Sequence, residues 1–252
     1  MLKVEGITKI IEPYTIVENL SFTIKDGEIF GFLGPNGAGK SSTIKILTGL
    51  NKATSGEIFF DELSLKDNER KIKKLTGYVP ETPLLYNSLT SKEYLEFIAG
   101  IYEIPYQETS ERIKRMLGLF EFEEYADALI STYPKGVLQK LSLASAWLIE
   151  PKFLLLDEPS ASLDPKATKR LKSSLKLTSE KGVCIFLTTH ILEIAEALCD
   201  RIAIIDKGRI IAVGTMDELR HLSWGGNGSL EDIFLSLTGG SEYKDLLSYL
   251  VK

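Results

Sequence analysis

Cysteine, histidine and long apolar runs are all scarce in this sequence. It has two cysteines, Cys184 and Cys199, and two histidines among 252 residues. The wide spacing of the cysteines favours a buried, reduced pair over a disulfide framework or a metal site. No apolar run approaches the ~20 residues that span a bilayer, and the first six residues lack the basic-then-apolar layout of a signal peptide. We therefore expect no transmembrane segment and a protein that stays in the cytosol.

An excess of basic residues is also missing. The chain has 30 Lys and Arg against 35 Asp and Glu, which gives a net charge of −5. General affinity for a nucleic-acid backbone requires a basic face, so we expect no nucleic-acid partner. With 44% hydrophobic residues, the chain can bury a sizeable core, as one large domain or as a domain with a subdomain.

A glycine-rich segment lies between the apolar run 29–33 and a segment of helical pattern. It consists of Gly34, Pro35, Asn36, Gly37, Ala38, Gly39, Lys40, Ser41 and Ser42. The glycines allow successive backbone N–H groups to point inward, the following helix adds the positive end of its dipole, and Lys40 adds a full charge. The expected strand before it and helix after it favour a phosphate-binding P-loop, in which Ser41 ligates Mg²⁺, over an ordinary glycine-rich turn.

Two carboxylates end the next fully apolar strand, expected at 153–156. Asp157 and Glu158 follow it directly. The carboxyl ends of parallel strands face the ligand crevice, which would bring Asp157 beside Mg²⁺ and Glu158 beside the terminal phosphate. Glu158 is then the candidate general base for the attacking water. A solvated acidic turn is the alternative, and the upstream P-loop disfavours it.

A histidine follows the expected strand 183–187. His190 would lie next to the acidic strand, where it could contact the terminal phosphate and hold the base and water in line. This placement favours a catalytic role over a structural one. His221, in the polar tail, has no such support and is expected on the surface.

Periodicity predicts an α/β fold. Segments 2–9 and 16–24 alternate with a period of two, as in antiparallel strands with one exposed face. Helical spacing follows over 91–128, and strands and helices alternate over 153–205, which predicts a parallel sheet covered on both faces. The expected architecture is a P-loop NTPase core with a mostly parallel sheet, an N-terminal antiparallel β part and an inserted helical subdomain.

Taken in order, these motifs resemble the ATP-binding subunit (nucleotide-binding domain) of an ABC transporter over nearly the whole chain. Segment 161–165 is similar to the family's D-loop and supplies Ser162, Leu163 and Asp164. His190 takes the place of the switch histidine, and segment 229–238 resembles the exporter class with a separate ATPase polypeptide. The resemblance implies an ABC ATP-binding domain over 1–216, with the helical subdomain at about 88–150, and a C-terminal helical tail over 217–252.

The resemblance also implies a mechanism and partners. Two such subunits would sandwich ATP head to tail, close on ATP, reopen after hydrolysis and move a membrane subunit. The implied cofactors are ATP and Mg²⁺. The implied partners are a second ATP-binding subunit, as a homodimer or heterodimer, and an integral membrane permease subunit, with the protein held peripherally at the cytoplasmic face of the membrane. Two alternatives are a hydrolysis-poor regulatory or heterodimer partner and, less favoured, a soluble ABC protein acting on ribosomes or DNA.

Two positions depart from the family pattern. The signature segment, which completes the partner's ATP site, corresponds to Tyr133, Pro134, Lys135 and Gly136. Pro134 replaces the signature serine and offers neither a hydroxyl nor an N–H, although the Gly136 amide and the Lys135 charge remain. Glu81 stands where the family usually has a glutamine, and its carboxylate can still ligate Mg²⁺. We expect these departures to slow hydrolysis or to mark a subunit that pairs with a different ATPase.

Two further expectations remain open between alternatives. The family stacks adenine on an aromatic residue ahead of the P-loop, and Tyr14 is the nearest aromatic side chain to that register, so it is either the stacking residue or a plain surface tyrosine. Loop 82–89 is unusually apolar. Its Leu84, Leu85 and Tyr86 either dock a short helix of the membrane subunit or pack under the helical subdomain.

Overall fold

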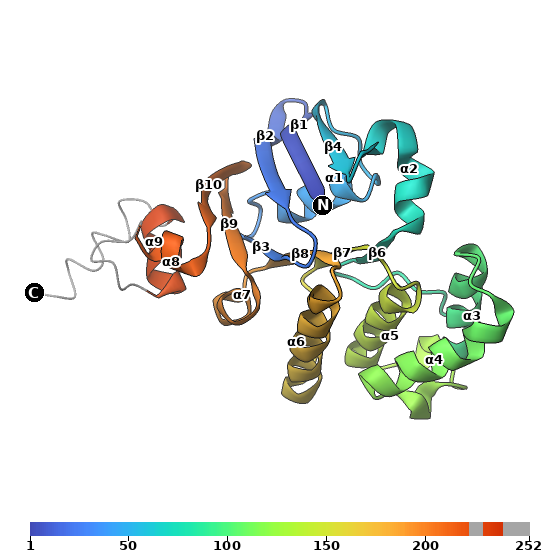
Figure 1. Ribbon diagram of the computed structural model, residues 1–252. Coiled ribbons are helices and arrows are strands. Elements are labelled where there is room, and N and C mark those ends of the chain that lie inside the picture. Colours follow the sequence, from blue (N-terminus) through green and yellow to red (C-terminus); the bar gives the residue numbers. More distant parts are fainter. Residues whose placement is uncertain (222–228, 239–252) are drawn as a thin grey trace, which may run out of the picture.

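The structure, a computed structural model, describes residues 1–221 and 229–238, and the rest of the predicted tail lies outside this part (Figure 1). The strands are β1 (Leu2–Ile11), β2 (Tyr14–Ile24), β3 (Ile29–Leu33), β4 (Ser55–Phe60), β5 (Leu63–Ser64), β6 (Thr76–Val79), β7 (Phe153–Asp157), β8 (Cys184–Thr189), β9 (Arg201–Asp206) and β10 (Arg209–Gly214). The helices are α1 (Lys40–Leu47), α2 (Leu65–Lys74), α3 (Ser91–Ile101), α4 (Tyr106–Phe120), α5 (Lys135–Leu148), α6 (Pro165–Glu180), α7 (Leu192–Leu198), α8 (Met216–Arg220) and α9 (Leu230–Thr238), with short 3-10 turns η1 (Glu123–Tyr125) and η2 (Ile130–Thr132).

The strands form two sheets, as the periodicity predicts. A four-stranded antiparallel sheet has the order β2-β1-β4-β5, and a six-stranded sheet has the order β10-β9-β3-β8-β7-β6. In the larger sheet all neighbouring strands pair in parallel except β10, which pairs antiparallel with β9 at one edge. The start of β1 shows the expected alternation, with Leu2 and Val4 buried and Lys3 and Glu5 exposed. The predicted α/β class is therefore confirmed.

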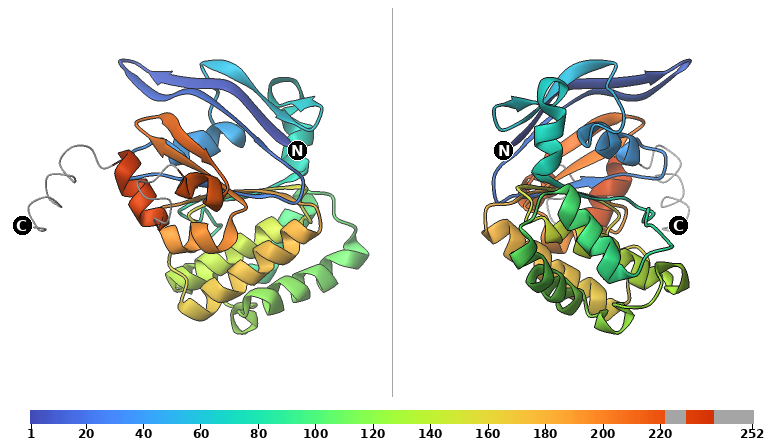
Figure 2. Two further views of the ribbon diagram at one scale, coloured as in Figure 1. Left: turned by 60° about the vertical axis from the view of Figure 1, so that its left-hand side comes forward. Right: turned by 90° about the vertical axis from the view of Figure 1, so that its right-hand side faces the viewer.

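A layer of phenylalanines joins the two sheets. The ring of Phe186 on β8 lies 5.9 Å from that of Phe22 on β2 and 5.3 Å from that of Phe32 on β3. These buried rings belong to a core that the antiparallel sheet and α1 share with one face of the large sheet. The other face of the large sheet is covered by α5, α6 and α7, and Figure 2 shows α3 to α6 gathered on the side away from the antiparallel sheet.

The inserted helices follow the predicted spacing and have identifiable start signals. Thr90 and Glu93 form a capping box at the start of α3, which satisfies two backbone N–H groups. Pro134 stands at the N-cap of α5, so the signature segment leads into the start of that helix. Helix α2, which precedes the inserted helices, has non-helical dihedral angles at Asn68.

The end of strand β8 also extends further than its apolar run predicts. The strand continues to Thr189, because the β-branched Thr188 and Thr189 are fully buried between neighbouring strands. Helix α7 starts after this extension. Thr188 and Thr189, the two residues before His190, are thus part of the sheet, and His190 is the first residue after the strand.

The far end of the described chain packs on the same core. Leu219 of α8 and Leu230 and Ile233 of α9 are buried in the cluster that lies under α5 to α7. Within residues 1–221 and 229–238, none of the helices is long and apolar enough to cross a lipid bilayer. Cys184 and Cys199 are buried free thiols, and burial raises the pKa of each to about 12.

Candidate nucleotide-binding and catalytic site

Three neighbouring parallel strands deliver the predicted site residues to one edge of the large sheet. Strand β8 lies between β3 and β7. Its register pairs Thr189 with Leu33, the residue before the P-loop, and pairs Thr188 with Asp157. The P-loop, the acidic pair and His190 therefore converge although they are far apart in sequence, as expected for the carboxyl ends of a parallel sheet.

The P-loop conformation depends on two of its glycines. A side chain at Gly34 would place a Cβ 2.5 Å from the Ile205 carbonyl oxygen, so only glycine fits there. Gly39 has φ 108°, a left-handed value that favours glycine, and it is the N-cap of α1. Ala38 is buried, whereas Asn36 and Gly37 are exposed. The loop thus leads directly into a helix N-terminus, the geometry that binds phosphate through backbone N–H groups.

The Lys40 ammonium group is buried beside this loop. It donates hydrogen bonds to the carbonyl oxygens of Gly34 at 2.7 Å and Pro35 at 3.2 Å. Burial lowers the pKa of Lys40, and the negative charges of Glu158, Asp157 and Glu81 oppose that shift. The lysine is thus held by weak neutral acceptors in an acidic setting, and phosphate oxygens would be stronger acceptors for it.

Asp157 is buried and held on two sides by hydroxyl groups. Thr188 Oγ1 donates to Asp157 Oδ1 at 2.5 Å, and Ser41 Oγ lies 3.5 Å from the same oxygen. The hydroxyl of the predicted metal ligand therefore lies next to the predicted metal-supporting carboxylate. Oxygen donors of this kind suit Mg²⁺, which commonly keeps water and phosphate oxygens as its other ligands.

Glu158 and His190 are in direct contact. His190 Nδ1 lies 2.9 Å from Glu158 Oε1, with the histidine side chain 59% exposed and the glutamate almost buried. Glu158 has φ 48°, an unusual left-handed value for a glutamate, and its N–H lies 3.1 Å from Thr188 Oγ1. Backbone outliers of this kind are common at active sites, where surrounding contacts impose them. His190 can therefore hold and orient the Glu158 carboxylate, which is a proton acceptor, at this edge of the sheet.

The other predicted site residues lie around this edge. Glu81 is exposed just beyond β6, and its charge acts on Lys40. Tyr14, at the start of β2, is 70% exposed. Further along the same strand, Val17 lies against Gly39, because a Cβ on that glycine would meet Val17 Cγ1 at 2.8 Å. Strand β2 thus passes next to the P-loop with the Tyr14 ring free of core packing. Among the described residues, no three His, Cys, Asp or Glu side chains gather as a metal cluster.

The signature segment divides into an anchor and an exposed turn. Tyr133 is buried, and its hydroxyl donates to the Tyr125 and Ala128 carbonyls, the latter at 3.2 Å. Pro134 and Lys135 are exposed at the start of α5, where Pro134 forms no side-chain cap. The segment thus presents a helix N-terminus without the hydroxyl that a serine would add.

The predicted D-loop lies between the end of β7 and the start of α6. Ser162 has φ 64°, Leu163 packs on the core, and Asp164 caps α6 by accepting the Ala167 N–H at 2.8 Å. That backbone hydrogen bond holds the pKa of Asp164 below its ordinary value. The side chains of Leu163 and Asp164 therefore hold the end of this loop that leads into α6.

The apolar loop after Glu81 has both exposed and packed side chains. Leu84 is 82% exposed and Tyr86 is 57% exposed, with the Tyr86 ring 5.4 Å from that of Phe97. Leu85, in contrast, packs against the core. Two of the three side chains are thus available to a partner, and the third anchors the loop.

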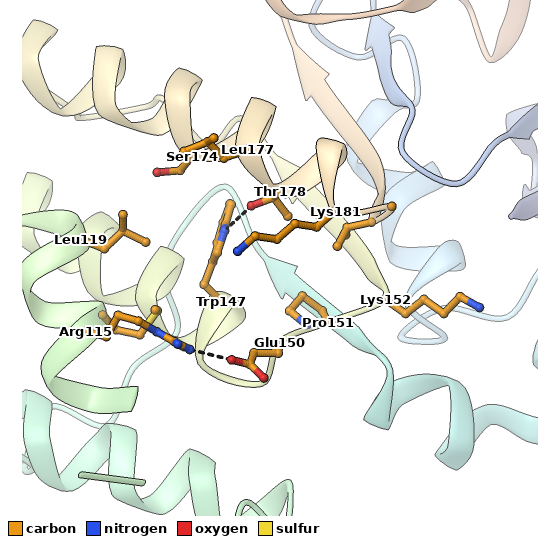
Figure 3. A pocket seen from close by; sticks show the side chains of 13 residues that line it. Arg115, Leu119, Trp147, Glu150, Pro151, Lys152, Ser174, Leu177, Thr178 and Lys181 are labelled. Atoms are coloured by element: carbon orange, nitrogen blue, oxygen red, sulfur yellow. Dashed lines mark hydrogen bonds and ion pairs between the residues drawn. The ribbon is translucent and has the colours of Figure 1, made fainter. Parts of the chain in front are cut away.

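A cavity of about 650 Å³ lies away from these residues, where α4, α5 and α6 meet (Figure 3). Trp147 lines it and donates through Nε1 to Thr178 Oγ1 at 3.0 Å, and Arg115 binds Glu150 at 2.6 Å. None of the predicted site residues lines this cavity. This cavity lies between the inserted helices and α6, and it is separate from the site at the carboxyl ends of the parallel strands.

Two polar residues at the site were missed by the sequence reasoning. Thr188 binds Asp157 and the Glu158 backbone, and the buried Gln139 of α5 donates to the Pro159 carbonyl at 3.1 Å. A threonine at the end of a buried strand and a glutamine on the core side of a helix are the available signals. Neither signal identifies the partner, because the pairing depends on strand register and helix packing.

Comparison with known proteins agrees with this geometry. A family model described as ABC transporter matches residues 17–161. The chain is 37% identical over 219 residues to the linearmycin resistance ATP-binding protein LnrL of Bacillus subtilis (strain 168), covering 87% of this chain and 70% of that protein. It is 33% identical over 238 residues to the ABC-type transporter ATP-binding protein EcsA of the same organism, covering 94% and 96%.

Solved structures give the same result. An ATP binding subunit of an ABC transporter matches with a TM-score of 0.89 at 33% identity, covering 94% of this chain and 99% of that one. The dimeric post-hydrolysis state of the ATP-binding cassette MJ0796, bound to ADP and Pi, matches with a TM-score of 0.79 at 27% identity, covering 86% and 99%.

Fold and site together define a P-loop ATPase with an inserted helical part. The chain belongs to the ABC transporter family, as an ATP-binding subunit that hydrolyses ATP to drive transport. The resemblance drawn from the sequence motifs is thereby confirmed.

Proposed function

We propose that this chain is the motor subunit of an ABC exporter, bound peripherally to a separate membrane permease at the cytoplasmic face of the membrane. The similarity to LnrL, and to a protein with the name 'Probable multidrug ABC transporter ATP-binding protein YbhF', supports export. The contact of 2.9 Å between Glu158 and His190 is the observation that carries hydrolysis, because it supplies a carboxylate base with an orienting partner.

Phosphate binding is assigned to the P-loop, residues 34–42. Its inward N–H groups and the start of α1 would hold the phosphates, and Lys40 would exchange the Gly34 and Pro35 carbonyls for phosphate oxygens. Adenine would stack on Tyr14, which is exposed on a strand that passes next to Gly39.

Magnesium fits the oxygen donors beside Lys40. Ser41 would ligate the ion directly, Asp157 would support it, and Glu81, just after β6, would add a carboxylate. When bound, Mg²⁺ neutralises charge that develops on the terminal phosphate. Asp157 is already oriented by Thr188, so this chain holds the metal-supporting carboxylate in place through its own hydrogen bonds.

Glu158 is proposed to accept the proton of the attacking water, and His190 to hold that carboxylate and contact the terminal phosphate. We expect Glu158→Gln to keep ATP binding and to lower turnover by about 100-fold or more. Glu124→Gln, an exposed glutamate on η1, is the matched control. Measured on the purified chain with Mg²⁺ and ATP, full residual activity of Glu158→Gln would refute its role as base.

A hydrolysis-poor partner subunit is the second candidate, and Pro134 favours it. In a head-to-tail dimer the turn at the exposed Pro134 and Lys135 and the half-buried Gly136 would meet the partner's ATP. Pro134 brings no hydroxyl to that contact, so an ATP bound opposite it loses one hydrogen bond. In a homodimer both sites carry this loss. In a heterodimer a partner with an intact signature would complete this chain's own site.

The membrane partner is proposed to dock on Leu84 and Tyr86. Their exposure next to Phe97 forms an apolar patch at the edge of the helical part, and a patch of this kind is typical of an interface. The division into a domain over 1–216 and a tail over 217–252 also remains a proposal. Because Leu219, Leu230 and Ile233 bury on the main core, we propose that the first part of the tail stabilises the domain.

A further inference from the structure

Helix α5 is hydrogen-bonded directly to the loop that follows strand β7. Gln139, in the second turn of α5, is 1% exposed, and its Nε2 donates to the Pro159 carbonyl oxygen at 3.1 Å. Pro159 is the residue after Glu158. A buried amide that loses its hydrogen-bond partner is costly, so this hydrogen bond holds the helix and the loop at a defined separation.

A second contact of the same two segments lies one turn earlier. A Cβ at Gly136 would stand 2.9 Å from the carbonyl oxygen of Ser162, so the first turn of α5 touches the D-loop. Glu158 and Ser162 both have left-handed φ values, 48° and 64°. Such conformations persist when surrounding contacts determine them. The loop from Glu158 to Ser162 is therefore shaped by α5 at both ends.

We propose that Gln139 is a positioning residue that couples the two ATP sites of the closed dimer. The inference rests on the proposed head-to-tail dimer, in which the start of α5 faces the partner's ATP. When the start of α5 binds against the partner's ATP, α5 shifts. Gln139 passes this shift to the Pro159 carbonyl, and Glu158 of the same chain moves with it. A displacement of about 1 Å at a catalytic group can change the rate by up to ~100-fold, so a small shift is sufficient.

Mixed dimers distinguish this role from simple support of the signature turn. Gln139→Met keeps the length of the side chain and removes the amide donor. In the first arrangement, Gln139→Met is placed in a chain with intact Glu158, and a large excess of Glu158→Gln chain provides the partner. In the second arrangement, Gln139→Met is placed in the excess Glu158→Gln chain instead. The reference pair has intact Gln139 in both chains, and turnover is counted per intact Glu158.

We expect the first arrangement to lose turnover by roughly tenfold against the reference pair and the second to stay within about twofold. Equal loss in both arrangements, or loss only in the second, overturns the proposal, because Gln139 would then merely support the turn that contacts the partner's ATP. Gln139→Asn keeps the donor with a shorter reach, and we expect it to give an intermediate loss in the first arrangement. It serves as the test if Gln139→Met does not fold.

Hydrogen exchange separates this inference from the proposed function. A reference pair without turnover would contradict hydrolysis at a single intact site of the proposed head-to-tail dimer and leave the hydrogen bond of the single chain to be judged by itself. In that chain, without ATP, we expect Gln139→Met to speed amide exchange at Ala161 and Leu163, whose N–H groups bond within the loop to Glu158 and Ser160. Unchanged exchange at both amides would overturn the inference whatever the turnover.

Discussion

The Thr188 hydroxyl donates a 2.5 Å hydrogen bond to Asp157 and lies 3.1 Å from the backbone N–H of Glu158. One side chain on β8 thus holds both carboxylate residues that end β7. The two strands pair in register at Asp157 and Thr188. Thr188 is therefore the link that sets the orientation of the metal-supporting carboxylate relative to the proposed base.

Removing that hydroxyl should impair the metal-dependent step. We expect Thr188→Val, which keeps the shape of the side chain, to lower turnover roughly tenfold and to raise the Mg²⁺ concentration needed for half-maximal activity, since partners of metal-binding groups typically contribute at this level. Thr188→Ser keeps the hydroxyl and should retain most activity. A Mg²⁺ titration of ATPase rate on both variants checks this, and equal behaviour of the two would contradict it.

Restoring the signature hydroxyl should raise the rate. A charge-assisted hydrogen bond to phosphate contributes about 1.5–3 kcal/mol, so Pro134→Ser should increase turnover by roughly tenfold if the chain forms a homodimer. Pro134→Ala removes the ring without adding a hydroxyl and serves as control. Steady-state turnover of the three purified proteins tests this, and a Pro134→Ser rate equal to or below that of the unaltered chain counts against it.

The exposed pair on the loop after β6 should control docking without affecting the fold. We expect Leu84→Asp with Tyr86→Asp to abolish co-purification of the membrane subunit while the melting temperature and ATP binding are retained, because both side chains are exposed. Leu177→Asp, also exposed but beside the cavity under α6, is the matched control. Undiminished capture by the double variant would remove this patch from the interface.

Both thiols should be unreactive in the folded chain. Burial raises the pKa of Cys184 and Cys199 from 9.0 to about 12, so almost no thiolate is present at about pH 8. We expect slow modification by N-ethylmaleimide in buffer and rapid modification of both thiols in denaturant. Fast native labelling of either cysteine would contradict the burial.

The same shift predicts how stability depends on pH. Between pH 9 and 12 the unfolded chain releases the thiol protons that the folded chain keeps, so the free energy of unfolding falls as pH rises. Each thiol contributes at most ~1.4 kcal/mol per pH unit. Below pH 9 none of this free energy of unfolding is lost. Denaturant titrations over this range should show a smaller slope for a Cys184→Ala, Cys199→Ala variant than for the unaltered chain.

The aromatic layer between the sheets should be the most sensitive part of the core. Phe186 is fully buried among Phe22, Phe30 and Phe32. We expect Phe186→Ala to lower the free energy of unfolding by about 3–5 kcal/mol, through lost transfer energy and the cavity left behind. Phe97→Ala, at a half-exposed position, should cost less than about 1 kcal/mol. Denaturant unfolding of the two variants compares them directly.

The sequence predicted the architecture well because its signals are local. The P-loop, the apolar strand before Asp157 and the helical spacing of the inserted segment each need only neighbouring residues to be recognised. Element boundaries were less accurate where tertiary burial decides them, as at Thr188 and Thr189, which extend β8 beyond its apolar run. The sequence therefore predicted the class of the protein more accurately than it predicted the exact ends of the strands.

The details of the site depend on pairings that no local pattern encodes. Thr188 acts on Asp157 only because β7 and β8 align in one register, and Gln139 reaches Pro159 only because of how α5 packs. Leu84, Leu85 and Tyr86 show the same limit, since all three are apolar but only Leu85, the middle one, packs partly buried against the core. Long-range geometry selects which of several similar side chains takes part.

The position of β3 in the sheet has a consequence for synthesis of the chain. Within the part of the chain that the structure describes, this strand, which ends at the P-loop, pairs with β8 on one side and β9 on the other, and Phe30 stands opposite Phe186. More than half of the chain separates the two partners, so the strand that carries the nucleotide loop cannot be seated in its sheet until β8 and β9 have left the ribosome. Nascent chains that end before Thr189 should therefore bind no ATP, and ATP affinity should arise abruptly, late in translation, as long-range parallel pairing becomes possible.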